Sequence, residues 1–306
     1  MAIVGAGGVG GLLAVMLARV GHDVRVMARA ASLRAIRERG IRTRGPDGEH
    51  HAVIARASDD AAELGAVDLV LVTVKAWQLA ELGPRLVPLI GPATLVVPMQ
   101  NGVEASEVLA GALGEDHVIG GVCRVISWAE QPGEIRWIGG TPSLTLGARQ
   151  PAQREAVEAC AATLRAAGVE VIVSAEIERA RWLKFQFIAA YSAVGAAARL
   201  PLGELRQDPQ ARGQLEAVMH EVGAVAAARG VVLGAKAVEK TMQRIDVLPA
   251  DATASMHRDL VAGRPSELHE LIGAVVRLGR EANVATPVSA ALYATLEPLE
   301  RQARAR

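Results

Sequence analysis

Two periods of apolar residues alternate along the first part of the chain. Short runs that are apolar at nearly every position predict strands, and apolar residues three or four positions apart predict helices. Runs that are apolar on both faces, such as VDLVLVTV at residues 67–74, are typical of a parallel sheet covered by helices. Strands separated by helical stretches predict a doubly wound α/β domain. The predicted strands are residues 2–4, 23–27, 67–74, 94–99 and 169–173, with an antiparallel pair at 134–140 and 143–147.

The remainder of the chain shows only the helical period. No strand pattern follows residue 174, and proline or glycine separates the helical stretches from one another. We therefore expect an α/β domain over residues 1–174 and an all-helical domain over residues 175–306. The predicted helical stretches are residues 175–198, 209–229, 235–245, 266–283 and 288–305.

The start of the chain carries no charge from Met1 to Ala18. An apolar run of about 18 residues raises the question of a membrane span or signal peptide. No basic region precedes the run, and five glycines gather between Gly5 and Gly11, where a spanning helix would be weakened. We expect no membrane association.

The glycines instead fit GxGxxG between a predicted strand and a predicted helix. In that context the first glycine makes the tight turn and the second lets the backbone approach a pyrophosphate. The third allows the helix to pack closely on the strand, and the pyrophosphate faces the amino end of that helix. The sequence therefore predicts a dinucleotide site at Gly5, Ala6, Gly7, Gly8, Val9 and Gly10.

Arg29 follows the second predicted strand, where NAD-binding sites carry an acidic residue for the ribose hydroxyls. A guanidinium pairs with a 2′-phosphate, which a carboxylate would repel. The predicted cofactor is NADPH.

The composition narrows the class of protein. The chain has 33 basic and 33 acidic residues, and 51% of its residues are apolar. Zero net charge argues against a nucleic-acid binder, and the apolar content argues against disorder. Cys123 and Cys160 stand alone, with no disulfide framework, and the histidines lack metal-ligand spacing. We expect a cytoplasmic protein with a small-molecule substrate, no metal and no nucleic-acid partner, and the helical domain leaves room for a homodimer.

Further motifs occur in a fixed order over essentially the whole chain. They are GAGGVG at residues 5–10, the arginine at 29, LVTVKAWQ at 71–78, QNGV at 100–103, RWLK at 181–184 and SMHRDLVAGRPSELHELIG at 255–273. With these motifs the chain resembles the ketopantoate reductases (2-dehydropantoate 2-reductases). The resemblance implies a Rossmann domain followed by a helical domain like that of 6-phosphogluconate dehydrogenase. It also implies NADPH-dependent reduction of ketopantoate to pantoate, in pantothenate biosynthesis.

The resemblance assigns roles to individual side chains. Lys184 corresponds to the general acid, and an ammonium there would stabilise and protonate the alkoxide left by hydride transfer. Asn101 corresponds to an asparagine that touches the nicotinamide ribose and the substrate, and Glu267 to a glutamate that contacts ribose or substrate. Ser255 corresponds to a serine that holds the substrate carboxylate. Lys75 ends a predicted strand, on the edge where doubly wound sheets bind ligands.

Four positions depart from the family. Ile188 and Ser192, which share a helical stripe with Lys184, replace asparagines, and so do Leu202 and Ala252. We keep Ser192 as a candidate substrate contact. Loss of these amides implies either that ketopantoate is bound through other residues or that the substrate is a different, less polar carbonyl compound.

Two other functions stay open. A β-hydroxyacid dehydrogenase also has a helical second domain with a catalytic lysine, but that class places an asparagine four residues later, where this chain has Ile188. A regulatory sensor that binds NADPH without turnover is the alternative from outside the enzymes.

Overall fold

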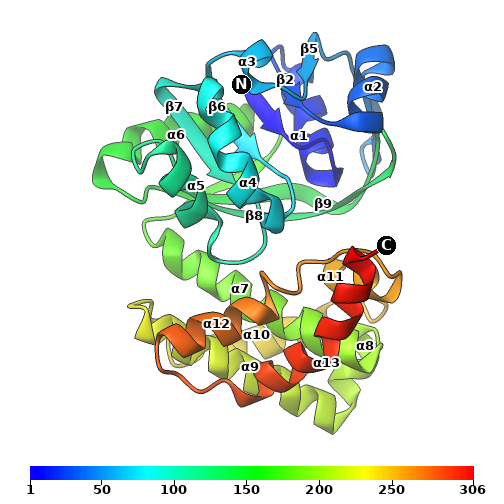
Figure 1. Cartoon of the computed structure of the whole chain (residues 1–306), viewed down its shortest axis with the longest axis vertical. Coiled ribbons are helices and arrows are strands. Elements are labelled where there is room, and N and C mark those ends of the chain that lie inside the picture. The colour runs from blue at the N-terminus through cyan, green and yellow to red at the C-terminus, as the bar shows by residue number, and fades with distance from the viewer. The chain divides into compact units, whose positions relative to one another are not determined.

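The computed structural model describes all 306 residues, and the chain divides into two units. Unit 1 comprises Met1–Gln100 and Glu104–Ile177, and unit 2 comprises Asn101–Val103 and Glu178–Arg306. Figure 1 shows the elements of both units in the order of the chain. No helix combines the length and apolar character that crossing a membrane requires.

Unit 1 contains all the strands. Its elements are β1 (Ala2–Val4), α1 (Gly8–Arg19), β2 (Arg25–Met27), α2 (Ala30–Arg39), β3 (Ile41–Gly45), β4 (Gly48–Ala52), β5 (Arg56–Ser58), α3 (Ala61–Leu64), β6 (Val67–Val72), the 3₁₀ helix η1 (Ala76–Gln78), α4 (Leu79–Leu82), η2 (Gly83–Leu89), β7 (Ile90–Pro98), α5 (Ala105–Leu113), β8 (Gly120–Gln131), β9 (Glu134–Gly147), η3 (Pro151–Gln153), α6 (Arg154–Ala166) and β10 (Glu170–Val173).

The first sheet is parallel throughout, with strand order β5-β2-β1-β6-β7. Successive residues of β1 face opposite cores: Ile3 packs with α1 and α2, while Ala2 and Val4 pack with α3, α4 and α5. Helices therefore cover both faces, and the predicted doubly wound fold is confirmed. The order runs outward in opposite directions from β1 and β6, so the edge at their carboxyl ends is where such sheets bind ligands.

A second sheet has the order β10-β9-β3-β4, with β8 paired to β9. The prediction of an antiparallel pair at 134–140 and 143–147 is wrong, because both segments belong to the single strand β9. Its antiparallel partner is β8, which pairs Arg124 with Ser143 and Ile126 with Ile138. The GGTP segment between those positions is thus a bulge on a continuous strand, held by β8, and makes no turn.

Helix α1 explains the uncharged start of the chain. Its buried side chains share one core with residues of the first sheet and of β8 and β9 in the second. A helix that is apolar on every side is normally buried on every side. Two of its glycines serve this packing, since a β carbon at Gly8 would strike the backbone of Ser127 and one at Gly11 would strike Ile135.

Unit 2 is helical, as predicted. Its elements are α7 (Ile177–Ala198, whose first residue closes unit 1), α8 (Leu202–Gln207), α9 (Pro209–Ala228), α10 (Ala237–Val247), α11 (Ser255–Val261), α12 (Ile272–Glu281) and α13 (Pro287–Arg304).

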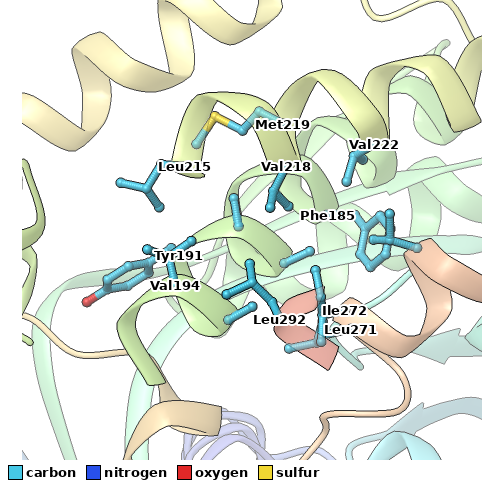
Figure 2. Packing of buried hydrophobic residues seen from close by; sticks show 14 of the residues in the cluster. Phe185, Tyr191, Val194, Leu215, Val218, Met219, Val222, Leu271, Ile272 and Leu292 are labelled. Carbon is cyan, nitrogen blue, oxygen red and sulfur yellow. The ribbon is translucent and has the colours of Figure 1, made fainter. Parts of the chain in front are cut away.

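The core of unit 2 forms where α7, α9, α12 and α13 meet. Figure 2 shows Phe185 of α7, Val222 of α9, Ile272 of α12 and Leu292 of α13 among its side chains. The prediction of one helix over residues 266–283 is wrong, because α12 begins only at Ile272. Residues 267–271 form a bend and a turn, and the amide of Ser266 just before them donates to the Glu300 side chain of α13.

Candidate active site

The glycine loop is fixed by bonds to the strand ends around it. Gly5 follows β1 with φ of +100°, a conformation that favours glycine. The hydroxyl of Thr73, just beyond β6, donates to the carbonyl oxygens of Val4 at 3.0 Å and Gly5 at 2.8 Å. Gly10 packs so closely on Gly5 that a β carbon there would overlap the Gly5 carbonyl oxygen. The tight turn and the close helix approach predicted for this motif are both present.

The amino end of α1 is arranged to receive an anion. Gly7 is the N-cap residue, no side chain caps the helix, and its first turn has no acidic residue. The first amides of a helix lack partners within it and carry partial positive charge. Nothing lies within 4 Å of the position a β carbon would take on Gly7. The residues present therefore fit a pyrophosphate, which needs free amides and close access to the backbone.

Arg29 lies beside this loop. Strands β1 and β2 pair in parallel with Val4 opposite Met27, and the Gly5 amide donates to the Met27 carbonyl at 2.9 Å. Two residues later Arg29 is exposed and is the N-cap residue of α2. Arg29 thus follows the strand that adjoins the glycine loop, and no carboxylate occupies the position of the usual ribose-binding acid.

Lys75 follows the carboxyl end of β6, the other strand that borders β1. Its ammonium lies 5.7 Å from the centroid of the Trp77 ring, and its backbone amide donates to the Gln78 side chain at 3.1 Å. The buried Gln100 donates from Nε2 to the carbonyls of Val72 and Val74, at 2.9 Å each. We did not single out Gln100 or Thr73 from the sequence, although Gln100 begins the QNGV motif.

In unit 2, Lys184 lies on α7, the longest helix. Lys184 is half-buried. Its neighbours Trp182 and Phe185 are buried, and their rings meet edge to face with centroids 5.6 Å apart. Ile188 and Ser192 follow on the same stripe of the helix at intervals of four residues. Core packing on one side of α7 therefore sets the direction in which this stripe points.

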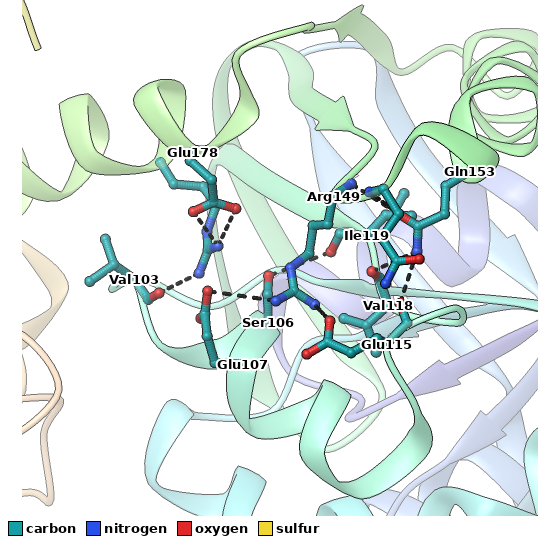
Figure 3. A network of polar contacts seen from close by, with 11 residues as sticks. Val103, Ser106, Glu107, Glu115, Val118, Ile119, Arg149, Gln153 and Glu178 are labelled. Carbon is teal, nitrogen blue, oxygen red and sulfur yellow. Dashed lines mark hydrogen bonds and ion pairs between the residues drawn. The ribbon is translucent and has the colours of Figure 1, made fainter. Parts of the chain in front are cut away.

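Arg181, one turn before Lys184, is a positioning residue that we did not identify from the sequence. Its side chain is 3% exposed and donates twice to Glu178 at 2.7 Å. It also donates to the carbonyl of Val103 (Figure 3). Because Arg181 is buried and lies on α7, its bond to Val103 holds the QNGV turn against that helix. Its place in the RWLK motif was the sequence signal that could have identified Arg181.

Asn101 and Glu267 are brought together, although 166 residues separate them in sequence. The Asn101 amide Nδ2 donates to Glu267 Oε2 at 3.4 Å, and Glu267 is 4% exposed. Glu270, three residues on, has a buried oxygen without a hydrogen-bond partner. Burial raises the pKa of its carboxyl, to which Glu267 and Glu300 add, while Arg304 opposes the shift.

The four departures from the family form two neighbouring pairs. Ile188 and Ser192 are one turn apart on α7, and the Leu202 amide donates to the Ala252 carbonyl at 3.0 Å. Leu202 is fully buried in the core of unit 2, and Ala252 packs against that core. Asn101 and Asn283 are the only asparagines in the chain, so no displaced asparagine takes over the missing amides.

Ser192 and Ser255 lie on different helices. Ser255 is partly buried and begins α11, whereas Ser192 is fully buried and its hydroxyl has no hydrogen-bond partner. His257 and Tyr191 also bury unpartnered polar atoms, and His257 Nδ1 lies 3.4 Å from where a β carbon on Gly195 would be. Burial lowers the pKa of His257, helped by Arg258. Unit 2 thus retains polar atoms next to the stripe of α7 that carries Lys184.

Polar contacts elsewhere in unit 1 serve the scaffold. Arg149 pairs with Glu115 at 2.6 Å, and the Gln153 side chain donates to carbonyls including that of Val118 (Figure 3). These bonds hold the segment between α5 and β8 against the segment that leads into α6. No group of three or more histidine, cysteine, aspartate or glutamate side chains in the chain is arranged to hold a metal ion.

The comparison with known proteins covers both units. Residues 1–151 match the family model described as ketopantoate reductase PanE/ApbA, and residues 176–300 match the model of its C-terminal domain.

Individual relatives cover nearly the whole chain. A 2-dehydropantoate 2-reductase of Mesorhizobium japonicum is 32% identical over 97% of this chain and 96% of that one. The crystal structure of a PanE/ApbA family ketopantoate reductase from Ralstonia eutropha is 30% identical, with a TM-score of 0.89 over 99% of this chain and all of that one. D-Mandelate dehydrogenase, solved with NADH and anilino(oxo)acetate, has a TM-score of 0.90 over 99% of this chain and 100% of its own. It is 22% identical, which shows a shared fold.

Proposed function

Because the chain belongs to the ketopantoate reductase family, whose members are oxidoreductases acting on CH–OH groups, we propose that it reduces a 2-oxo acid to the 2-hydroxy acid with NADPH. The observation that carries this proposal is the glycine loop at the edge of the sheet where the strand order reverses. There the amino end of α1 has neither a side-chain cap nor an acid.

Unit 1 would hold the cofactor. The amides at the start of α1 would bind the pyrophosphate, with Gly7 leaving room for its approach. Arg29 would pair with the 2′-phosphate through two parallel hydrogen bonds, and Lys75 would supply a further positive charge at the end of β6. When bound, the nicotinamide supplies the hydride for the reduction.

Unit 2 would supply the acid and the substrate contacts. The ammonium of Lys184 would donate a proton to the carbonyl oxygen as negative charge develops on it. Ser255 would donate to the substrate carboxylate. Asn101, held by Glu267, would orient the reacting groups, and a fixed amide loses no freedom at the moment of reaction.

Ketopantoate is the first substrate to consider, by family membership, and the reaction would then belong to pantothenate biosynthesis. A second candidate is a 2-oxo acid with a less polar side chain. Ile188, Leu202 and Ala252 favour it, since they place apolar groups where the family has amides. Sites built to hydrogen-bond a substrate hydroxyl reject analogues without one by about 10⁴-fold or more, so the two candidates are readily distinguished.

The test is a substrate panel with purified protein. NADPH and NADH are each offered with ketopantoate and with 2-oxo acids bearing aliphatic or aromatic side chains, and cofactor absorbance is followed. We expect oxidation of NADPH with at least one compound, and formation of the matching 2-hydroxy acid. Tight NADPH binding with no oxidation across the panel would indicate a sensor and overturn the proposal.

A further inference from the structure

Helix α13, the last helix of the chain, is hydrogen-bonded to Ser266, the residue that precedes Glu267. The Ser266 amide donates to both carboxylate oxygens of Glu300, at 3.1 and 3.0 Å, and its hydroxyl donates to Glu300 Oε2 at 2.5 Å. The carbonyl of Ser266 accepts from Arg304 Nη2 at 3.1 Å, and Arg304 Nε pairs with Glu300 Oε1 at 2.6 Å. Every polar group of Ser266 is therefore bound by the last turns of α13.

Burying the carboxylate of Glu300 costs free energy unless the charge is compensated. Ser266 and Glu300 are both fully buried. A buried carboxylate is tolerated only when it is paired and hydrogen-bonded, and Arg304 with the two groups of Ser266 meets that condition. The bonded residues are 34 positions apart, and the turns they fix carry Glu267. Hydrogen bonds from an amide and a hydroxyl to a carboxylate are short and directional, so they fix the position of the Ser266 backbone.

We propose that Glu300 is a positioning residue which, by fixing Ser266, sets the carboxylate of Glu267 against Asn101. The inference rests on the proposed function only in that Asn101 and Glu267 are there given roles in binding. Glu300 acts through the backbone of Ser266, and Arg304 supports it as the counterion.

The opposite end of α13 offers a matched control. Glu221 of α9 accepts the amides of Val288 and Ser289, at 2.8 Å each, and the Ser289 hydroxyl at 2.5 Å. Like Glu300, it accepts one serine hydroxyl and two hydrogen bonds from the backbone. The amides of two residues of α13 donate to Glu221, whereas the single amide of Ser266 donates to both oxygens of Glu300. Substituting Glu221 removes a comparable anchor of α13 without touching the segment of Glu267.

The first test needs neither substrate nor cofactor. Because Asn101 and Asn283 are the only asparagines, asparagine labelled with ¹⁵N in its side-chain amide gives two NH₂ signals from the full chain. Glu267→Gln identifies the shift that reports loss of the carboxylate from Asn101. We expect Glu300→Gln to move the Asn101 signal toward that position, and Glu221→Gln to leave it in place. An Asn101 signal unmoved by Glu300→Gln, or moved equally by Glu221→Gln, would overturn the proposal.

The second test is kinetic. In metal sites, loss of a group that orients a ligand typically lowers activity about 10- to 100-fold, and we expect a loss of that size in kcat/KM for Glu300→Gln. If Glu300 acts through Glu267, the same substitution in a Glu267→Gln background costs less than about threefold more. Equal losses in the two backgrounds would make Glu300 a general stabiliser and contradict the proposal.

A gentler variant covers the case in which Glu300→Gln does not fold. Ser266→Ala removes only the hydroxyl contact and keeps the Glu300–Arg304 pair. It should move the Asn101 signal in the same direction by a smaller amount, and no movement would count against the proposal. Absence of turnover with every 2-oxo acid would overturn the proposed function, while the NMR comparison would still decide the role of Glu300.

Discussion

The α carbon of Gly10 packs against the carbonyl oxygen of Gly5, leaving no room for a side chain between them. Thr73 donates to that same oxygen at 2.8 Å, so three chain segments meet at one atom. Gly7, in the same loop, faces open space. One glycine is therefore required by the protein itself, and the other is required only if a ligand approaches.

This difference gives a paired prediction. Gly10→Ala should destabilise unit 1, because the new methyl group overlaps Gly5 and neither backbone can yield cheaply, at a cost of about 1–3 kcal/mol. Gly7→Ala should leave the thermal unfolding temperature unchanged and weaken NADPH binding at least about tenfold. Calorimetry of the free protein and titration with NADPH measure the two effects, and normal NADPH affinity in Gly7→Ala would show that no phosphate approaches there.

Arg29→Ala should weaken binding of NADPH but not of NADH. Loss of a charge-assisted pair to phosphate costs about 1.5–3 kcal/mol, which is about 10- to 100-fold in the KM for NADPH. Arg34→Ala, at an exposed position of the same helix, is the control for nonspecific loss of charge. Equal changes for both cofactors would remove Arg29 from this role.

Lys184→Met should abolish most turnover without preventing cofactor binding. Removing a general acid costs about 10²- to 10⁴-fold in kcat, whereas methionine keeps much of the side chain's packing. Lys240→Met, on the exposed part of α10, should keep full activity. Single-turnover measurement with saturating NADPH separates the chemical step from binding, and a kcat within threefold of the unmodified protein would contradict the assignment.

Ile188→Asn would restore an amide one turn after Lys184. We expect it to raise kcat/KM for ketopantoate relative to a 2-oxo acid with an aliphatic side chain, by about tenfold or more, since polar recognition discriminates strongly. Ile188→Leu keeps the apolar character and should leave the ratio near that of the unmodified protein. An unchanged ratio in Ile188→Asn would mean that this position does not face the substrate.

His257 should make the protein less stable in mild acid. Its pKa is lowered by burial from 6.5, so the unfolded chain binds a proton that the folded protein does not bind between the lowered pKa and 6.5. Stability is therefore full above pH 6.5 and falls as the pH drops below it, by at most about 1.4 kcal/mol per pH unit. The free energy of unfolding, measured by urea denaturation at pH values from 7.5 to 5.5, should fall less with decreasing pH in His257→Leu than in the unmodified protein. His220→Leu, at an exposed position, is the control. An identical pH dependence in His257→Leu would indicate that folding does not change the pKa of His257, which would contradict the prediction.

Local chemistry was readable from the sequence, and contacts between distant residues were not. The strand, glycine turn and helix at residues 2–19 follow from neighbouring residues, so that fold element could be predicted. Gly8 and Gly11 have a further reason that no local pattern contains, because they face Ser127 and Ile135 of the second sheet. The helical period over residues 266–283 misled for the same reason, since the contact of Ser266 with Glu300, far along the chain, is absent from any local pattern.

The candidate site divides along the same line. Residues with characteristic chemistry in a motif, such as Lys184, could be singled out from the sequence. Arg181 and Gln100 hold backbone carbonyls of other segments, and a side chain that serves another segment's backbone leaves no periodic signal. The chemical roles of Lys184 and the other motif residues were inferred from the family resemblance, whereas the residues that position them are visible only in the structure.

The burial of α1 between two sheets has an electrostatic consequence. Water and salt reach little of the helix beyond its ends, so the field along its axis passes through a medium of low polarisability. Mobile ions screen such a field much less than they screen charges on an open surface. Attraction between the loop amides and a bound pyrophosphate should therefore persist at ionic strengths that weaken the pairing of the exposed Arg29 with a 2′-phosphate, and preference for the phosphorylated cofactor should narrow as salt rises.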